Sequence, residues 1–188
     1  MNRYFNSAQL HNADAYVADY NDKGDPKRGV EICIQKPVGI KSFHLSNPNC
    51  HEYWSVNFEK HQAFFQGESN CECMFTTIRK DHGKGKIALF VELKYGEEKN
   101  INKNAKKAFD QLINTQRLIK ERGCIDSQYK VYLNISSPKY PNKEPFNAFL
   151  LSQDDIKQKL DKYDVILLGL NEVIILTPKN IRIPRQEI

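Results

Sequence analysis

The sequence predicts an α/β protein with a central mixed β-sheet flanked by helices. Three observations carry this prediction: an apolar strand over residues 87–94, a strand-like segment over 71–78, and an amphipathic helix over 102–122 that leads into a strand over 130–136. A turn joins the first two segments, and a helix between two strands usually makes a right-handed crossover between parallel neighbours. The expected core is therefore an antiparallel hairpin, a crossover helix and a parallel strand.

The strand over residues 87–94 is apolar on both faces. Because side chains alternate along a strand, Ala88 and Phe90 lie on the face that ends in Glu92 and Lys94, and the intervening positions are apolar as well. Two apolar faces are typical of a strand inside a covered sheet, where an unpaired charge is costly. The two charges at the end of this strand therefore need a structural or chemical reason.

The preceding strand-like segment carries a second carboxylate. Glycines and polar residues separate the two strands, as in a hairpin turn. A turn centred on Gly83 sets Glu72 opposite Lys94 and Met74 opposite Glu92. Directly opposed residues have Cβ atoms roughly 5 Å apart, and a slip of one residue would turn Glu72 to the other face. The expected register thus gathers Glu72, Glu92 and Lys94 on one face.

Two carboxylates and a lysine form a suitable set for hydrolysing a phosphodiester bond. Mg²⁺ prefers oxygen ligands, keeps several waters and usually takes one or two protein carboxylates, so Glu72 and Glu92 are the expected ligands, with Mn²⁺ as the alternative ion. Such an ion polarises a phosphoryl oxygen and lowers the pKa of the attacking water. The ammonium of Lys94 would place that water or offset developing negative charge.

The order of acidic residue, hairpin, apolar strand and Glu-x-Lys resembles the PD-(D/E)XK nuclease superfamily, also called restriction-endonuclease-like. Glu72 matches its first acidic position, and Glu92 with Lys94 matches the E-x-K half, within residues 50–137. The resemblance implies a restriction-endonuclease-like core and a Mg²⁺-dependent endonuclease or exonuclease acting on DNA. It also implies that Gln111 is an active-site neighbour, the alternative being an ordinary glutamine on a helix surface. RNA as the substrate stays open.

The crossover helix is predicted from apolar residues at three- and four-residue steps, with Gly123 following as its C′ residue. The apolar positions are Ala105, Ala108, Phe109, Leu112, Ile113 and Ile119.

Positive charge is concentrated in the same part of the chain. The net charge is +5, and residues 79–130 contain 13 Lys and Arg against 7 Asp and Glu. Phosphate backbones attract such a patch without sequence readout, whereas lysines are also the usual residues of a solvated helix face. The candidate nucleic-acid contacts are Lys84, Lys86, Lys103, Lys106 and Lys107.

Composition favours a cytoplasmic protein that does not enter a membrane. The five cysteines are odd in number and widely spread, as expected of reduced thiols. The amino terminus lacks the apolar run of a secretory signal, and no uninterrupted apolar run approaches about 18 residues. A zinc site could be drawn from Cys50, His51, Cys71 and Cys73, but this pattern contains no Cys-x-x-Cys, so apolar packing is the better interpretation of the two strand cysteines.

Residues 1–188 are expected to form a single domain, with a core near 50–137. Before the core, residues 7–20 have a sparse helical pattern and Val30–Ile34 alternates like a strand. Residues 54–65 fit either strand or helix. Glu59 at the end of that stretch could be an additional acidic ligand, although a surface role is the more common one for a glutamate.

After the core, residues 152–177 are predicted to form a helix and a closing hairpin. The helix spans Asp154–Tyr163 with Ser152 as its N-cap, and apolar runs at 165–170 and 173–176 form the hairpin or two adjacent strands. Their hydrophobicity means that they are covered within the fold or shared with a second copy.

Three functions fit these features. The first is a Mg²⁺-dependent nuclease, for which a homodimer would be the simplest way to cut both strands. The second is a catalytically inactive protein of the same fold that binds nucleic acid or a protein partner. The third is a structural domain in which Glu92 and Lys94 pair with each other and with helix residues.

Overall fold

The computed structural model describes residues 4–23, 28–78 and 85–182, which form a mixed α/β fold of three layers. Within these residues the central sheet has six strands, in the spatial order β1 (Gln9–His11), β5 (Tyr53–Asn57), β6 (Cys73–Thr77), β7 (Lys86–Leu93), β8 (Tyr129–Ser136) and β9 (Val165–Leu168). A second sheet contains β11 (Asn180–Arg182), β10 (Glu172–Thr177), β4 (Phe43–Ser46), β2 (Ala15–Asp19) and β3 (Val30–Cys33).

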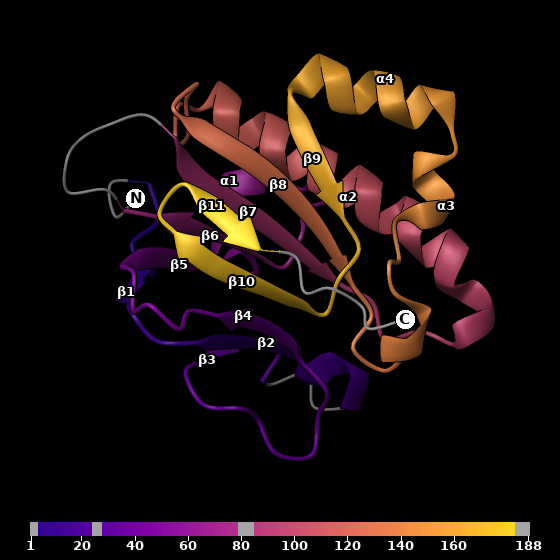
Figure 1. The fold of residues 1–188 in the computed structure, drawn as a ribbon, viewed down its shortest axis with the longest axis horizontal. Helices are drawn as coiled ribbons and strands as arrows, with labels where there is room; N and C mark the ends of the chain where they lie inside the picture. Colours follow the sequence, from indigo (N-terminus) through magenta and orange to yellow (C-terminus); the bar gives the residue numbers. More distant parts are fainter. Residues whose placement is uncertain (1–3, 24–27, 79–84, 183–188) are drawn as a thin grey trace.

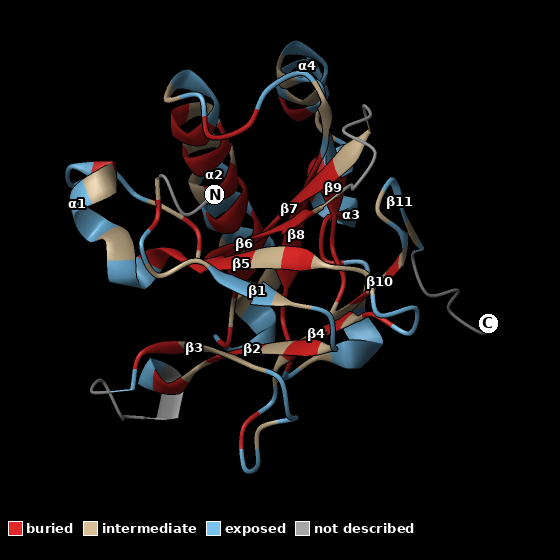
Figure 2. Ribbon diagram, turned by 90° about the vertical axis from the view of Figure 1, so that its left-hand side faces the viewer, coloured by how far each residue is buried: buried red, intermediate tan, exposed pale blue. Residues whose placement is uncertain are grey.

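The described helices lie on the face of the central sheet that points away from the second sheet (Figures 1 and 2). They are α1 (Gln62–Phe65), α2 (Ile101–Glu121), α3 (Ala148–Leu151) and α4 (Asp154–Tyr163). The expectation of helices flanking the sheet is therefore correct for one face only. The second sheet covers the other face, because its apolar residues Val17 and Phe43 pack with Leu89 and Val91 of β7.

The core order predicted from sequence is present. Strands β5, β6 and β7 form an antiparallel meander, and α2 connects β7 to the parallel strand β8. Phe90 packs with Ala108 and Phe109 of α2, so the two apolar faces of β7 serve two different cores, one on each side of the sheet. At the end of α2, Gly123 has a φ of 70° and its neighbour Cys124 donates its backbone N–H to the carbonyl of Ile119 at 3.0 Å, which closes the helix as expected.

The hairpin register differs from the prediction by two residues. Met74 lies opposite Phe90 rather than Glu92, and continuing this register brings Glu72 level with Glu92 rather than with Lys94. The proposed turn centre lies in residues 79–84, outside the described part of the chain. Because the shift is by two residues, each side chain keeps its predicted face.

The predicted helix over residues 7–20 is wrong. The chain forms β1 and β2 there, and Leu10, which the helical pattern placed on the apolar face, is 50% exposed. Ala15 and Val17 alternate into the core between the sheets, so strand pairing prevails over a weak helical period. The strand predicted at residues 30–34 is confirmed as β3.

Residues 54–65, whose sequence fits either a strand or a helix, contain both. Strand β5 ends at Asn57, whose side chain accepts a hydrogen bond from the Glu59 amide and begins a 3₁₀ turn over Phe58–His61 that leads into α1. The apolar residues change from a strand period to a helix period within this short stretch, so neither period is dominant in its sequence.

The predicted closing hairpin at residues 165–176 is also wrong. Strand β9 pairs with β8 in the central sheet, whereas β10 pairs with β4 in the second sheet, both in parallel. Between them Gly169 crosses so near Asn147 that a Cβ would lie 2.3 Å from its backbone nitrogen. The helix over Asp154–Tyr163 is confirmed, but Ser152 does not cap it, because its hydroxyl donates to the Phe149 carbonyl at 2.7 Å instead.

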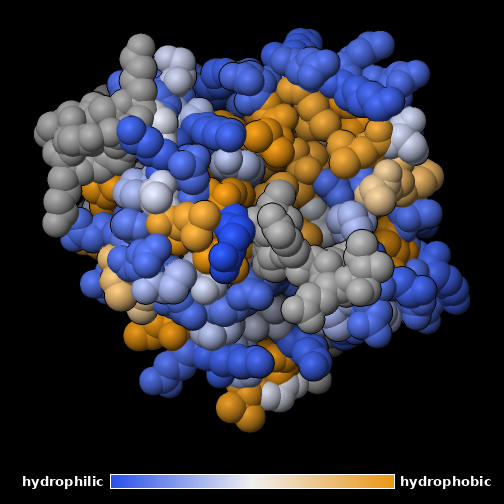
Figure 3. Space-filling view, in the orientation of Figure 1, coloured by the Kyte–Doolittle hydropathy of each residue, from blue (hydrophilic) through white to orange (hydrophobic). Residues whose placement is uncertain are grey.

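An apolar surface accompanies the edge strand β9. Ile166 of β9 is exposed, as are Phe149 and Leu151 of α3, and Figure 3 shows apolar surface between α4 and β9. Homodimer formation through this surface stays a prediction.

In the part of the chain that is described, no helix has the length and apolarity needed to cross a bilayer.

Asn134 of β8 binds the connection between β9 and β10. Its buried side chain donates to the Leu170 carbonyl at 2.8 Å and accepts from the Leu170 amide at 3.1 Å. We expect Asn134→Ala to lower the free energy of unfolding by about 2 to 3 kcal/mol, because two buried backbone groups lose their partner. Urea denaturation measures the change, and exposed Asn102→Ala serves as the control. Equal stability of the two variants would contradict this role.

Candidate active site

The charged residues predicted from sequence meet at one edge of the central sheet. Glu92 is the penultimate residue of β7, Lys94 follows that strand, and Glu72 immediately precedes β6. Because β6 and β7 are antiparallel, the beginning of one lies beside the end of the other. The structure therefore brings together all three residues of the predicted site.

Glu92 and Lys94 are held by each other and by α2. Glu92 is 0% exposed, and the ammonium of Lys94, whose side chain is 16% exposed, donates to Glu92 Oε1. The same ammonium donates to Gln111 Oε1 at 2.9 Å, and Gln111 Nε2 donates to the Asn70 carbonyl at 3.1 Å. Gln111 thus lies in contact with the predicted site and orients its lysine.

The polar edge of α2 fixes the segment that leads to Glu72. The Cys71 amide donates to Thr115 Oγ1 at 2.8 Å, and Asn114 Nδ2 donates to the Ser69 carbonyl at 2.7 Å. Together with the contact of Gln111 to Asn70, these bonds attach three consecutive residues to one helix. Glu72 is therefore placed by α2 as well as by its strand.

Burial dominates the electrostatics of Glu92. It raises the pKa of Glu92 to about 7, although the charge and hydrogen bond of Lys94 act in the opposite direction. Its second oxygen, Oε2, is buried and has no hydrogen bond of standard geometry with the described residues. A buried carboxylate oxygen without a donor is costly unless the group is protonated or a cation lies beside it.

Burial also raises the pKa of Glu72. Burial, followed by the negative charges of Glu92 and Asp19, holds the pKa of Glu72 well above its usual range, and Lys94 opposes the shift. Two carboxyl groups that share one poorly solvated position resist simultaneous ionisation. A divalent cation would reverse this preference by stabilising both charges.

Asp19 is a neighbour that the sequence did not reveal. It ends β2, its amide donates to the Tyr95 hydroxyl at 3.4 Å, and its charge acts on Glu72. No local signal could have found it, because its segment was assigned to a helix and β2 belongs to the second sheet. Glu59 is instead structural: its carboxylate accepts from the Val30 amide at 2.6 Å and from Asn21 Nδ2 at 3.4 Å.

The residues fit an ion that needs few protein ligands. Within the described ranges no group of three or more His, Cys, Asp and Glu is arranged to hold a metal ion. Two carboxylates suffice for Mg²⁺, which retains much of its water. The zinc set is not assembled: Cys71 and Cys73 are buried, and the ring of His51 contacts the Leu176 carbonyl at 3.0 Å.

The candidate lysines are dispersed. Lys84 lies outside the described residues, and Lys86 begins β7, at the end opposite Glu92, where its ammonium lies 5.5 Å from the Tyr129 ring centroid. Lys103, Lys106 and Lys107 are exposed on α2. The positive charge of Lys107 helps to lower the pKa of Glu92, so this lysine lies within electrostatic reach of the site.

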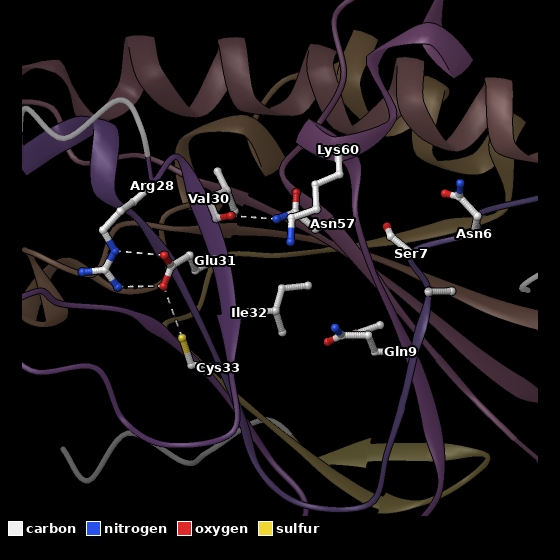
Figure 4. Close-up of a pocket in the computed structure, with 12 residues that line it drawn as sticks. Asn6, Ser7, Gln9, Arg28, Val30, Glu31, Ile32, Cys33, Asn57 and Lys60 are labelled. Carbon is white, nitrogen blue, oxygen red and sulfur yellow. Dashed lines mark hydrogen bonds and ion pairs between the residues drawn. The ribbon is translucent and has the colours of Figure 1, made fainter.

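A cavity lies near the site, and the candidate residues do not line it. Its volume is about 660 Å³, and its walls come from the segment around β1 and from β3 and β5 (Figure 4). Arg28 and Glu31 form a two-bond ion pair on one wall, and Asn57 donates to the Val30 carbonyl at 2.7 Å. Asn57 pairs with Cys73, so the cavity begins one strand away from Glu72.

Comparisons of this chain with protein-family models, with curated proteins and with solved structures found no match.

Folding stability should fall as pH rises from about 4.5 to 7 without divalent ions. A carboxyl whose pKa is raised in the folded state, as for Glu92 at about 7 against an ordinary 4.5, stabilises the fold below the lower value and loses this contribution up to the higher one. Glu92→Gln should remove this part of the pH dependence, on the order of 3 kcal/mol. Urea denaturation in EDTA at a series of pH values measures it.

The control for this measurement is Glu97→Gln, because Glu97 is an exposed glutamate paired with Lys99. Parallel pH profiles for the wild type and Glu92→Gln would contradict the assigned ionisation.

Proposed function

We propose that this protein is a Mg²⁺-dependent nuclease that hydrolyses phosphodiester bonds of DNA, with Mn²⁺ as an alternative ion. The single observation that carries the proposal is the fully buried Glu92, one oxygen of which contacts Lys94 while the other has no hydrogen bond of standard geometry with the described residues. Lys94 compensates only one of the two oxygens of this carboxyl group, and Glu72 adds a second acidic group beside it.

The topology supports the proposal in a second way. An antiparallel pair followed by a helix and a parallel strand, with the acidic residue before β6 and Glu-x-Lys at the end of β7, is the arrangement that the resemblance to the PD-(D/E)XK superfamily implies. We propose that the meander β5–β7, α2 and β8 constitute a restriction-endonuclease-like core.

The residues have distinct roles in the proposed reaction. Glu72 and Glu92 hold the ion, which when bound polarises the phosphoryl oxygen and lowers the pKa of the attacking water. Lys94 donates a hydrogen bond to that water or to the phosphate oxygens, where negative charge accumulates. Gln111 keeps the ammonium of Lys94 directed at the strand end, and the apolar cores on both sides of β7 keep bulk water from beneath it.

An inactive protein of the same fold, which binds nucleic acid or a protein partner, is the second candidate. The observation that favours it is the direct contact of Lys94 with Glu92, because this contact already occupies one of the oxygens needed by a metal ion. A structural domain would use the same ion pair for stability alone.

Purified protein should cut DNA in the presence of Mg²⁺ and not in EDTA. Glu92→Gln and Lys94→Met should each lower the rate by at least about 100-fold, since each removes a group that acts on the reacting atoms. Cleavage of supercoiled and linear DNA, resolved on a gel, measures the rate. Circular dichroism establishes that the variants are folded, and Glu97→Gln is the matched control. Undiminished cutting by both variants would rule out the assignment.

Mg²⁺ should also raise the melting temperature. A ligand that binds only the folded state adds about 2.7 kcal/mol of stability at 100 times its dissociation constant. The shift should be present in the wild type and Glu97→Gln and absent in Glu92→Gln. A melting temperature that Mg²⁺ leaves unchanged in the wild type would favour the structural alternative.

A further inference from the structure

Three residues of α2 border the candidate active site. Gln111 contacts Lys94 directly, as described above. Asn104 packs against the turn that follows Lys94, since a Cβ on Gly96 would lie 2.6 Å from Asn104 Nδ2. Residues three and four apart lie on the same face of a helix, so Lys107, midway between these two, occupies the same border. Two independent contacts therefore orient this side of α2 toward the end of β7.

Lys107 is exposed, and within the described ranges none of the ion pairs includes it. Two other cations of this region are engaged: Lys99 pairs with Glu97 at 2.9 Å, and Arg117 pairs with Glu68 and Glu121 at 2.9 Å. The charge of Lys107 acts on Glu92, which places it close to the site without a fixed contact.

The site itself offers an incoming phosphate little free positive charge. Acidic groups gather at this edge, and Lys94 is already committed to Glu92 and Gln111. A divalent ion held by two carboxylates is largely neutralised by them. Because DNA is polyanionic, its binding therefore needs another cation at the border of the site.

We propose that Lys107 binds a phosphate of the DNA strand next to the one cleaved at Glu92 and Lys94, and so positions the substrate. This inference rests on the proposed nuclease function and deepens it. The other helix lysines are less suitable. Lys103 shares the face of Lys107 but lies about 6 Å further from Gln111, Lys106 points about 100° away around the helix axis, and Lys120 lies about 20 Å from Lys107 along it, from 1.5 Å per residue.

The test measures binding separately from cleavage. A fluorescein-labelled DNA duplex is titrated with protein in Mg²⁺, in the Lys94→Met background that does not cut, and fluorescence anisotropy is followed at several salt concentrations. Adding Lys107→Ala should weaken binding about fivefold or more near 0.1 M salt and should reduce the slope of log K against log salt by about one. Adding Lys107→Arg, which keeps the charge, should restore both.

Lys120→Ala in the same background is the control, because it removes an equally exposed lysine from the same helix. Equal losses for Lys107→Ala and Lys120→Ala, or no loss for either, would overturn the inference while leaving the proposed function intact if the wild type cuts DNA. A wild type that neither binds nor cuts DNA would overturn both.

Discussion

The burial of one carboxylate governs this structure. Glu92 lies in a strand covered on both faces, and its environment offers it one ammonium and no further donor of standard geometry among the described residues. A charge in such a position is expensive, and the raised pKa of Glu92, about 7, expresses that cost. The surrounding elements are arranged to limit it: Lys94 follows two residues later, and Gln111 keeps that lysine in place.

The helix α2 performs two tasks through its two sides. Its apolar side packs Ala108 and Phe109 against β7 and completes the core. Its polar edge binds residues 69–71, the segment that ends at Glu72. Because both tasks fall on one rigid element, the separation of Glu72 and Glu92 depends on the packing of the helix as much as on strand register. Two acidic groups that lie close together in a buried position go against the usual preference for solvated, separated charges. Natural proteins tolerate such an arrangement mainly at functional positions.

The second sheet completes the fold and modifies the site. It covers the face of β7 opposite α2, which removes water from beneath Glu92, and it brings Asp19 to the sheet edge. It is assembled from segments far apart in the chain, since β4 pairs with β2 on one side and β10 on the other. Asn134 and Gly169 lie at the crossing from the central sheet to this one, where hydrogen bonding and close approach leave little freedom.

The sequence by itself determined the elements whose signal is local. The doubly apolar strand, the long amphipathic helix with Gly123 at its end, the strand over 130–136 and the gathering of Glu72, Glu92 and Lys94 all follow from periodicities within one segment or one hairpin. Only the tertiary structure decided the two-residue change in register, the separation of β9 from β10 into different sheets and the approach of Asp19. The physical reason is that these features are set by pairings between distant segments, whose energies come from burial against a partner that local sequence does not specify.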